Sequence, residues 1–213
     1  MNGPSGRRGM SAMDWDVLYR ETLPPWEVGF ASPELNRILD EWRFPKGTVL
    51  DLGCGTGADA VCLAQHGFDV TAVDFSPTAV ERARTRAQNA AANVCFVLED
   101  VFRFGLHAGV FDVVYDGSFY QYVRQWELNR LLDLLWRITK PGSFYICITK
   151  TTPQSLASEP PPVSEDDLRS ELGRLFELVQ IREFAFDSRV VRKTFSGISA
   201  VMRRPVPASI VRT

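Results

Sequence analysis

A short glycine-rich stretch carries the clearest chemistry in this sequence. It reads D-L-G-C-G-T-G over residues 51–57 and directly follows an apolar run that is typical of a buried strand. Glycines at this point (Gly53, Gly55 and Gly57) let backbone N–H groups approach a ligand without collision with side chains. Asp51 adds a carboxylate beside the loop. The stretch therefore predicts a binding loop for a small ligand.

Three further carboxylates stand at the ends of predicted strands. These are Asp74, Asp100 and Asp116. The carboxyl ends of parallel strands form one edge of a sheet, which is where such sheets bind ligands. Asp74 is spaced to accept both hydroxyls of a ribose, and Asp100 with Val101 to meet an adenine edge, while Asp116 would face the reactive end of the ligand. Each acid could instead cap its strand, but one ligand at that edge would account for all four.

A nicotinamide cofactor is an alternative that the same loop permits. Gly53, Gly55 and Ala58 satisfy the spacing G-x-G-x-x-G/A, and Asp74 follows at a distance suited to ribose. Asp51 argues against it, because its negative charge would repel a pyrophosphate but attract a sulfonium ligand with an α-amino group. The chain also closes with two apolar runs instead of a second mononucleotide-binding half.

The elements around these residues alternate between strands and helices. We predict strands over 48–53, 69–74, 93–100, 111–116, 143–150, 176–186 and 195–204. We predict helices over 58–66, 77–91, 125–139 and 165–175. Repeated strand–helix units imply an α/β fold with a parallel sheet covered on both faces, and the last two strands are close enough in sequence to pair antiparallel.

Local signals set several of these boundaries. Ser76 and Pro77 predict the start of one helix, and Ser164 with Asp167 the start of another. The helix 125–139 is amphipathic and is expected to end at the pair Pro141-Gly142. Its predicted buried face comprises Trp126, Leu128, Leu131, Leu132, Leu135 and Ile138. Four prolines predict an irregular loop over 151–163.

The stretch from Val49 to Asp116 resembles the core of class I S-adenosylmethionine (SAM)-dependent methyltransferases, whose first motif has the form D-x-G-x-G-x-G. The resemblance implies a Rossmann-like, seven-stranded, mostly parallel sheet that ends in an antiparallel hairpin. It also implies that SAM is the cofactor and that residues 14–204 form one domain. By that resemblance, the binding residues are Asp51, Gly53, Gly55 and Gly57 for the methionine part, Asp74 for the ribose, and Phe75, Asp100 and Val101 for the adenine.

A narrower resemblance lies in the N-terminal segment 14–45, which we expect to cap the domain. Its spacing of aromatic residues is similar to that of the thiopurine, thiol and halide methyltransferases. The resemblance implies that Trp15, Tyr19 and Trp26 line the SAM pocket, where an aromatic face would attract a sulfonium by about 0.5–2 kcal/mol. Packing of these rings onto the sheet is the alternative. We also expect segments 14–32 and 151–163 to act as a lid that SAM protects from proteases.

The acceptor side is less well defined. Residues 116–122 resemble a D-R-G-x-F-H-H pattern of related small-molecule methyltransferases, but Gln121 and Tyr122 replace both histidines. Asp116, Tyr120 and Tyr122 are the acceptor-side candidates. No conspicuous base stands there, which favours a thiol or another soft nucleophile, because a thiol supplies thiolate without help. A small-molecule N- or O-methyltransferase and a non-catalytic SAM-binding protein are the alternatives.

Composition narrows the classes of partner. The net charge of −2 and the absence of a basic tail argue against nucleic acid, and no apolar run is long enough for a membrane span. The four cysteines are scattered and there are only two histidines, so we expect no metal site and reduced thiols in a cytoplasmic protein. We expect a monomer or homodimer, with disordered tails at 1–13 and 205–213.

Overall fold

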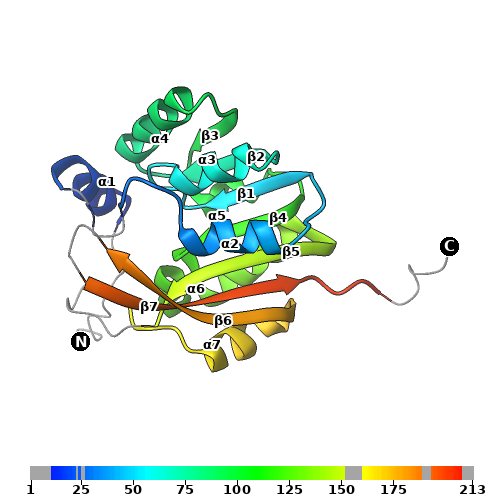
Figure 1. Ribbon diagram of the computed structural model, residues 1–213. Helices are drawn as coiled ribbons and strands as arrows, with labels where there is room; N and C mark the ends of the chain where they lie inside the picture. The colour runs from blue at the N-terminus through cyan, green and yellow to red at the C-terminus, as the bar shows by residue number, and fades with distance from the viewer. Residues whose placement is uncertain (1–10, 23, 25–26, 152–159, 189–192, 208–213) are drawn as a thin grey trace, which may run out of the picture.

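The computed structural model describes residues 11–22, 24, 27–151, 160–188 and 193–207. Seven strands form one sheet in the order β3-β2-β1-β4-β5-β7-β6 (Figure 1). Their bounds are Thr48–Leu52 (β1), Asp69–Asp74 (β2), Val94–Leu98 (β3), Phe111–Gly117 (β4), Thr139–Lys150 (β5), Glu177–Ser188 (β6) and Lys193–Arg203 (β7). The first five strands pair in parallel, while β7 pairs antiparallel with both β5 and β6. The predicted Rossmann-like sheet with a reversed final hairpin is thereby confirmed.

Helices cover both faces of this sheet. Their bounds are Ala12–Glu21 (α1), Pro33–Glu41 (α2), Ala58–Gln65 (α3), Pro77–Asn89 (α4), Val101–Phe104 (α5), Phe119–Ile138 (α6) and Glu165–Glu171 (α7), followed by the 3₁₀ turn Leu172–Arg174. Both predicted caps are present. Ser76 Oγ accepts the Ala79 N–H at 3.1 Å, and Ser164 forms a capping box with Asp167.

Alternation along the strands separates the core into two layers. Leu50 and Leu52 of β1 pack with α5, α6 and α7, whereas Val49 of the same strand packs with α2, α3 and α4. A strand with both faces buried has apolar residues in succession, which is why β1 reads as one continuous apolar run. The carboxyl ends of β1, β2 and β4 lie together at one edge of the sheet. There, α1 lies beside α4 (Figure 1).

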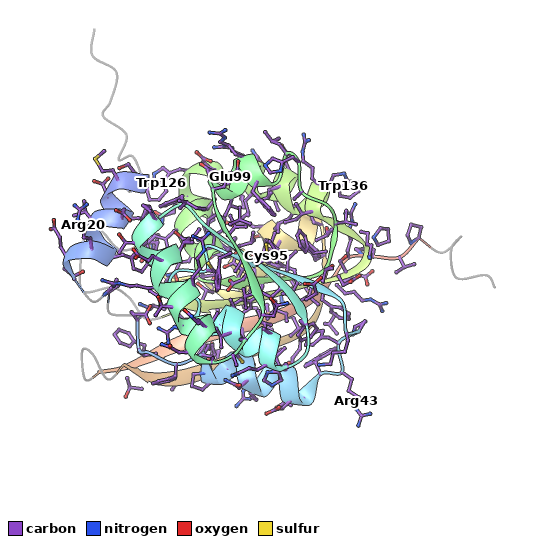
Figure 2. The ribbon with its side chains drawn as sticks, turned by 90° about the horizontal axis from the view of Figure 1, so that it is seen from above. Arg20, Arg43, Cys95, Glu99, Trp126 and Trp136 are labelled. Carbon is purple, nitrogen blue, oxygen red and sulfur yellow. The ribbon has the colours of Figure 1, made fainter. Side chains whose placement is uncertain are left out.

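Helix α6 differs from its prediction at both ends. It begins at Phe119 instead of residue 125, and its backbone is kinked at Glu127 (φ −134°). Trp126, predicted to be buried and labelled in Figure 2, has 49% of its surface exposed. At 3.6 residues per turn it lies two and a half turns before Leu135 and therefore on the opposite side of the helix. The helix ends at Ile138, before Pro141, because Thr139 already begins β5 by pairing with Phe111.

Some expectations concern residues outside the described ranges. Residues 1–10, 152–159 and 208–213 are among these, so most of both predicted tails and of the loop 151–163 are not tested. Helix α1 begins at Ala12 and thus includes the last two residues of the predicted N-terminal tail. Two N-terminal helices, α1 and α2, were not anticipated as such. Across the described parts of the chain, the helices are either too short or too polar to cross a bilayer.

Candidate active site

The glycine loop joins the end of β1 to the start of α3. Gly53, Gly55 and Gly57 all have positive φ, at 66°, 53° and 76°. Gly55 needs its missing side chain for a second reason, because a Cβ at this position would lie 2.8 Å from Tyr19 Oη. The loop is thus closed over by a tyrosine from α1, which brings one predicted cofactor residue against another.

Asp74 fixes the conformation of this loop. Its Oδ2 accepts the Gly55 N–H at 2.9 Å, and its Oδ1 accepts the Ser76 N–H at 2.8 Å. The side chain is buried, and burial raises its pKa, while the two backbone donors oppose that rise. Asp74 is therefore a strand-end cap in this structure. Each carboxylate oxygen retains a further lone pair, so the predicted contact with a ribose stays a prediction.

Asp51 is the least satisfied polar group of the described core. The side chain is buried, and its Oδ2 has no hydrogen-bond partner there. Burial raises the pKa of Asp51 well above its usual value, and the nearby carboxylates of Asp59, Asp116 and Asp74 raise it further. A buried carboxylate among other acids is stabilised by an opposite charge. The site therefore fits a cationic ligand, as a sulfonium with an α-ammonium group is, and disfavours a pyrophosphate.

Asp116 and Tyr120 are structural residues here. Asp116 is fully buried and accepts hydrogen bonds from Tyr145 Oη at 2.7 Å and from the Tyr120 N–H at 2.9 Å. Burial raises its pKa to about 6, and those donors limit the rise. Tyr120 is also fully buried, with its Oη donating to Glu171 at 2.7 Å. Asp116 at the end of β4 and Tyr120 in the first turn of α6 are thus both held by partners within the protein. Their predicted roles on the acceptor side stay predictions.

Of the two predicted tryptophans in the N-terminal segment, the structure describes only Trp15. Trp15 lies against Tyr122 with ring centroids 4.9 Å apart, so α1 meets the first turns of α6. This pairing unites a predicted cofactor residue with a predicted acceptor residue at one edge of the sheet. Trp26 lies outside the described residues, and its role stays a prediction.

The adenine-side residues take ordinary structural positions. Asp100 is the N-cap of α5, where its Oδ1 accepts the Phe102 N–H at 2.7 Å. The Val101 side chain is buried in the core layer beneath α6, so a contact with adenine has to come from its backbone. Phe75 is half-buried at the end of β2. Their roles toward adenine stay predictions.

Several residues of the site had no signal in the sequence. Phe119 approaches within 3.0 Å of where a Cβ of Gly53 would stand, and so covers the first turn of the loop. Asp59 accepts the Ser32 N–H and the Tyr115 hydroxyl, both at 2.7 Å. Arg86 of α4 binds Thr56 of the glycine loop. These contacts join residues that are distant in sequence, which no local pattern could indicate.

Gln121 occupies the position of the first histidine in the related pattern. Its side chain is buried. Its Nε2 donates to Pro161 O at 3.0 Å, and its Oε1 accepts the Thr149 hydroxyl at 2.8 Å and the Lys150 N–H at 3.2 Å. The amide therefore joins α6 to the end of β5 and to the returning chain at residue 161. It is a structural link, and not a group that faces a substrate.

Comparison with known proteins agrees with this geometry. A family model described as a methyltransferase domain matches residues 49–142. The chain is 29% identical over 161 residues to 2-heptyl-1-hydroxyquinolin-4(1H)-one methyltransferase of Mycobacteroides abscessus, which covers 74% of this chain and 70% of that protein. It is 27% identical over 174 residues to probable thiol methyltransferase 2 of Arabidopsis thaliana, which covers 80% and 76%.

A solved structure gives a further likeness. It is described as "Conversion of a Disulfide Bond into a Thioacetal Group during Echinomycin Biosynthesis" and superposes with a TM-score of 0.78 at 25% identity, covering 94% of this chain and 96% of the other. The matched domain, the fold and the relatives together support a class I SAM-dependent methyltransferase with SAM as its cofactor. Within that class it resembles the thiol methyltransferases.

Proposed function

We propose that this enzyme transfers the methyl group of SAM to a thiol or another soft heteroatom of a small molecule. The observation that carries the proposal is that the polar groups predicted on the acceptor side already have hydrogen-bond partners within the protein. Asp116 and Tyr120 are buried and hydrogen-bonded within the protein, and Gln121 stands where a histidine base would be expected. A soft nucleophile is the acceptor that depends least on a protein base.

The chemistry follows from the acceptor's own ionisation. SAM supplies an electrophilic methyl group on a sulfonium. A thiol with a pKa of about 8.5 is already partly ionised at neutral pH, whereas a hydroxyl generally needs a base. The protein then has to hold the acceptor in line with the methyl group and exclude water. The approach of Tyr19 to Gly55 and the contact between Trp15 and Tyr122 support a role for these rings in that work.

The relatives support this choice of acceptor. One is named as a probable thiol methyltransferase, and the similar solved structure concerns the conversion of a disulfide bond into a thioacetal. Both of these proteins are thus associated with sulfur chemistry.

The test is an acceptor screen with methyl-labelled SAM that includes an alkyl thiol, thiophenol, iodide and a phenol. For the thiols, kcat/KM is measured between pH 5.5 and 9. We expect methylated thiols, with kcat/KM half-maximal at each thiol's own pKa and reaching a plateau above it. The plateau should therefore come at lower pH for thiophenol than for the alkyl thiol.

Two results would count against the proposal. Methylation of the phenol alone would show that the acceptor is a hydroxyl group. A rise at one fixed pH for both thiols would reveal a protein base that titrates there.

A second candidate is methylation of an N-hydroxyl or ring heteroatom in a bicyclic aromatic acceptor. The observation that favours it is the Mycobacteroides abscessus relative, whose name gives 2-heptyl-1-hydroxyquinolin-4(1H)-one as its substrate. Adding that compound to the same screen distinguishes the two candidates.

We further propose that residues 14–204 act as one domain with segment 14–45 as its cap. We propose a cytoplasmic monomer or homodimer without a nucleic-acid partner. Contacts of α1 with α4 support the role of the cap.

A further inference from the structure

Arg86 connects three parts of the molecule that are separate in sequence. From α4, its Nε donates to Thr56 O at 2.9 Å and its Nη2 to Thr56 Oγ1 at 3.1 Å. Its Nη1 donates to Gly29 O at 2.8 Å, and its Nη2 also pairs with Glu27 Oε1 at 3.0 Å. One guanidinium thus binds both the glycine loop and the N-terminal segment.

The network is closed on its other side. The Thr56 hydroxyl donates to the second carboxylate oxygen of Glu27 while it accepts from Arg86. Both charged side chains are largely shielded, with 26% of Arg86 and 11% of Glu27 exposed. A planar guanidinium with several fixed donors suits such a site better than an ammonium does. Loss of either partner would leave the other desolvated and unpaired.

The charge of Arg86 also acts on the acidic centre. Burial is the main influence on the pKa of Asp59 and raises it. Glu27 raises this pKa further, whereas the Arg86 guanidinium lowers it. Tyr115 and Ser32 donate to the same carboxylate. The position of the Arg86–Glu27 pair therefore affects the electrostatics of the site that Asp51 shares.

Helix α4 holds the N-terminal segment at a second point. Asp16 of α1 accepts the Ser76 hydroxyl at 2.7 Å and the Thr78 N–H at 3.0 Å, both at the start of α4. The beginning of α4 thus binds α1, and its third turn binds residues 27 and 29. Figure 1 shows α1 beside α4.

From this arrangement we propose that Arg86 is a positioning residue that couples the cofactor loop to the N-terminal segment. Ordering of the loop by SAM then strengthens docking of the segment, and docking of the segment strengthens cofactor binding by the same factor. The inference rests on SAM as cofactor and is independent of the acceptor.

The test measures binding of S-adenosylhomocysteine (SAH) by calorimetry to Arg86→Met, Glu27→Gln and the double variant. Arg82→Met, an exposed arginine one turn earlier in α4, is the matched control. We expect Arg86→Met to raise Kd by roughly 5- to 150-fold, the usual range for coupled sites, and Arg82→Met to leave it unchanged. The double variant should bind about as weakly as Arg86→Met alone, because the two residues act as one unit.

A second readout separates coupling from general destabilisation. Trypsin cleavage after Arg20, which lies on α1 and is labelled in Figure 2, reports undocking of that helix. SAH should slow this cleavage in the wild type and in Arg82→Met but not in Arg86→Met, and Arg86→Lys should show partial protection. The proposal is overturned if SAH protects Arg86→Met as well as the wild type, or if the two single changes add fully in the double variant.

Discussion

At the scale of single residues, the site is organised around buried acids. Asp51 has a carboxylate oxygen without a partner, whereas Asp74 and Asp116 are each held by two donors. Asp51 is therefore the carboxylate available to pair with a cationic ligand, whereas Asp74 and Asp116 stabilise the protein's own structure. The motif around Asp51 was predictable because the glycines and the acid are neighbours in sequence. The contact of Arg86 with Glu27 spans 59 residues and could come only from the fold.

The position of a carboxylate at a strand end does not by itself reveal its role. Asp74, Asp100 and Asp116 all stand at or near strand ends, and no sequence pattern distinguishes a cap from a ligand contact there. Asp100 caps α5, and Asp116 binds Tyr145 inside the core. Tyr145 lies 29 residues further along the chain, so its hydroxyl could not be assigned to Asp116 from local pattern.

Gly55 offers a direct test of the loop. In Gly55→Ala, the new Cβ would lie 2.8 Å from Tyr19 Oη at a backbone φ of 53°. Either the loop or α1 must shift. Strain at one residue costs about 1–3 kcal/mol and each 1.4 kcal/mol is tenfold in affinity, so we expect Kd for SAH to rise about tenfold or more. Gly173→Ala is the control, because a Cβ there would contact nothing within 4 Å. Equal affinities of the two variants, measured by calorimetry, would refute this account of the loop.

At the scale of elements, the sequence predicted helix starts correctly where a local capping pattern sets the boundary. Ser76-Pro77 and the Ser164–Asp167 pair begin helices as predicted. The prediction for α6 was less accurate, because Gly117 and Ser118 are followed at once by helix and the kink at Glu127 interrupts its apolar stripe. Tertiary packing of Tyr120 and Gln121 stabilises this first part of the helix, and periodicity alone does not reveal it.

Gln121 tests that packing. Replacing it with leucine removes the partner of the buried Thr149 hydroxyl and of Pro161 O. An unsatisfied buried group costs about 1–3 kcal/mol, so Gln121→Leu should lower the free energy of unfolding by about that amount. Gln125→Leu, one turn later and exposed, should change it by less than about 0.5 kcal/mol. Urea denaturation measures both, and equal stabilities would contradict the structural role given to Gln121.

At the scale of the whole molecule, the sheet order brings the functional residues to one edge. The order β3-β2-β1-β4-β5-β7-β6 places β1 between β2 and β4, so Asp51, Asp74 and Asp116 come from three adjacent strands. The alternation of strands and helices predicted the sheet and its parallel part. The short spacing of the last two strands predicted their antiparallel pairing, and the resemblance to methyltransferases implied the same hairpin. The docking of α1 onto α4 was not predictable, since it depends on Asp16 meeting the start of a distant helix.

The central claim is that this edge binds SAM through the glycine loop and its buried acids. It is tested most directly by calorimetric binding of SAH to the wild type and to Asp74→Ala. Asp69→Ala, at the exposed start of the same strand, is the matched control. We predict micromolar binding by the wild type and by Asp69→Ala, and none by Asp74→Ala, because the loop loses the acceptor of the Gly55 N–H. Absence of binding by folded wild type, or unchanged binding by Asp74→Ala, would contradict the account.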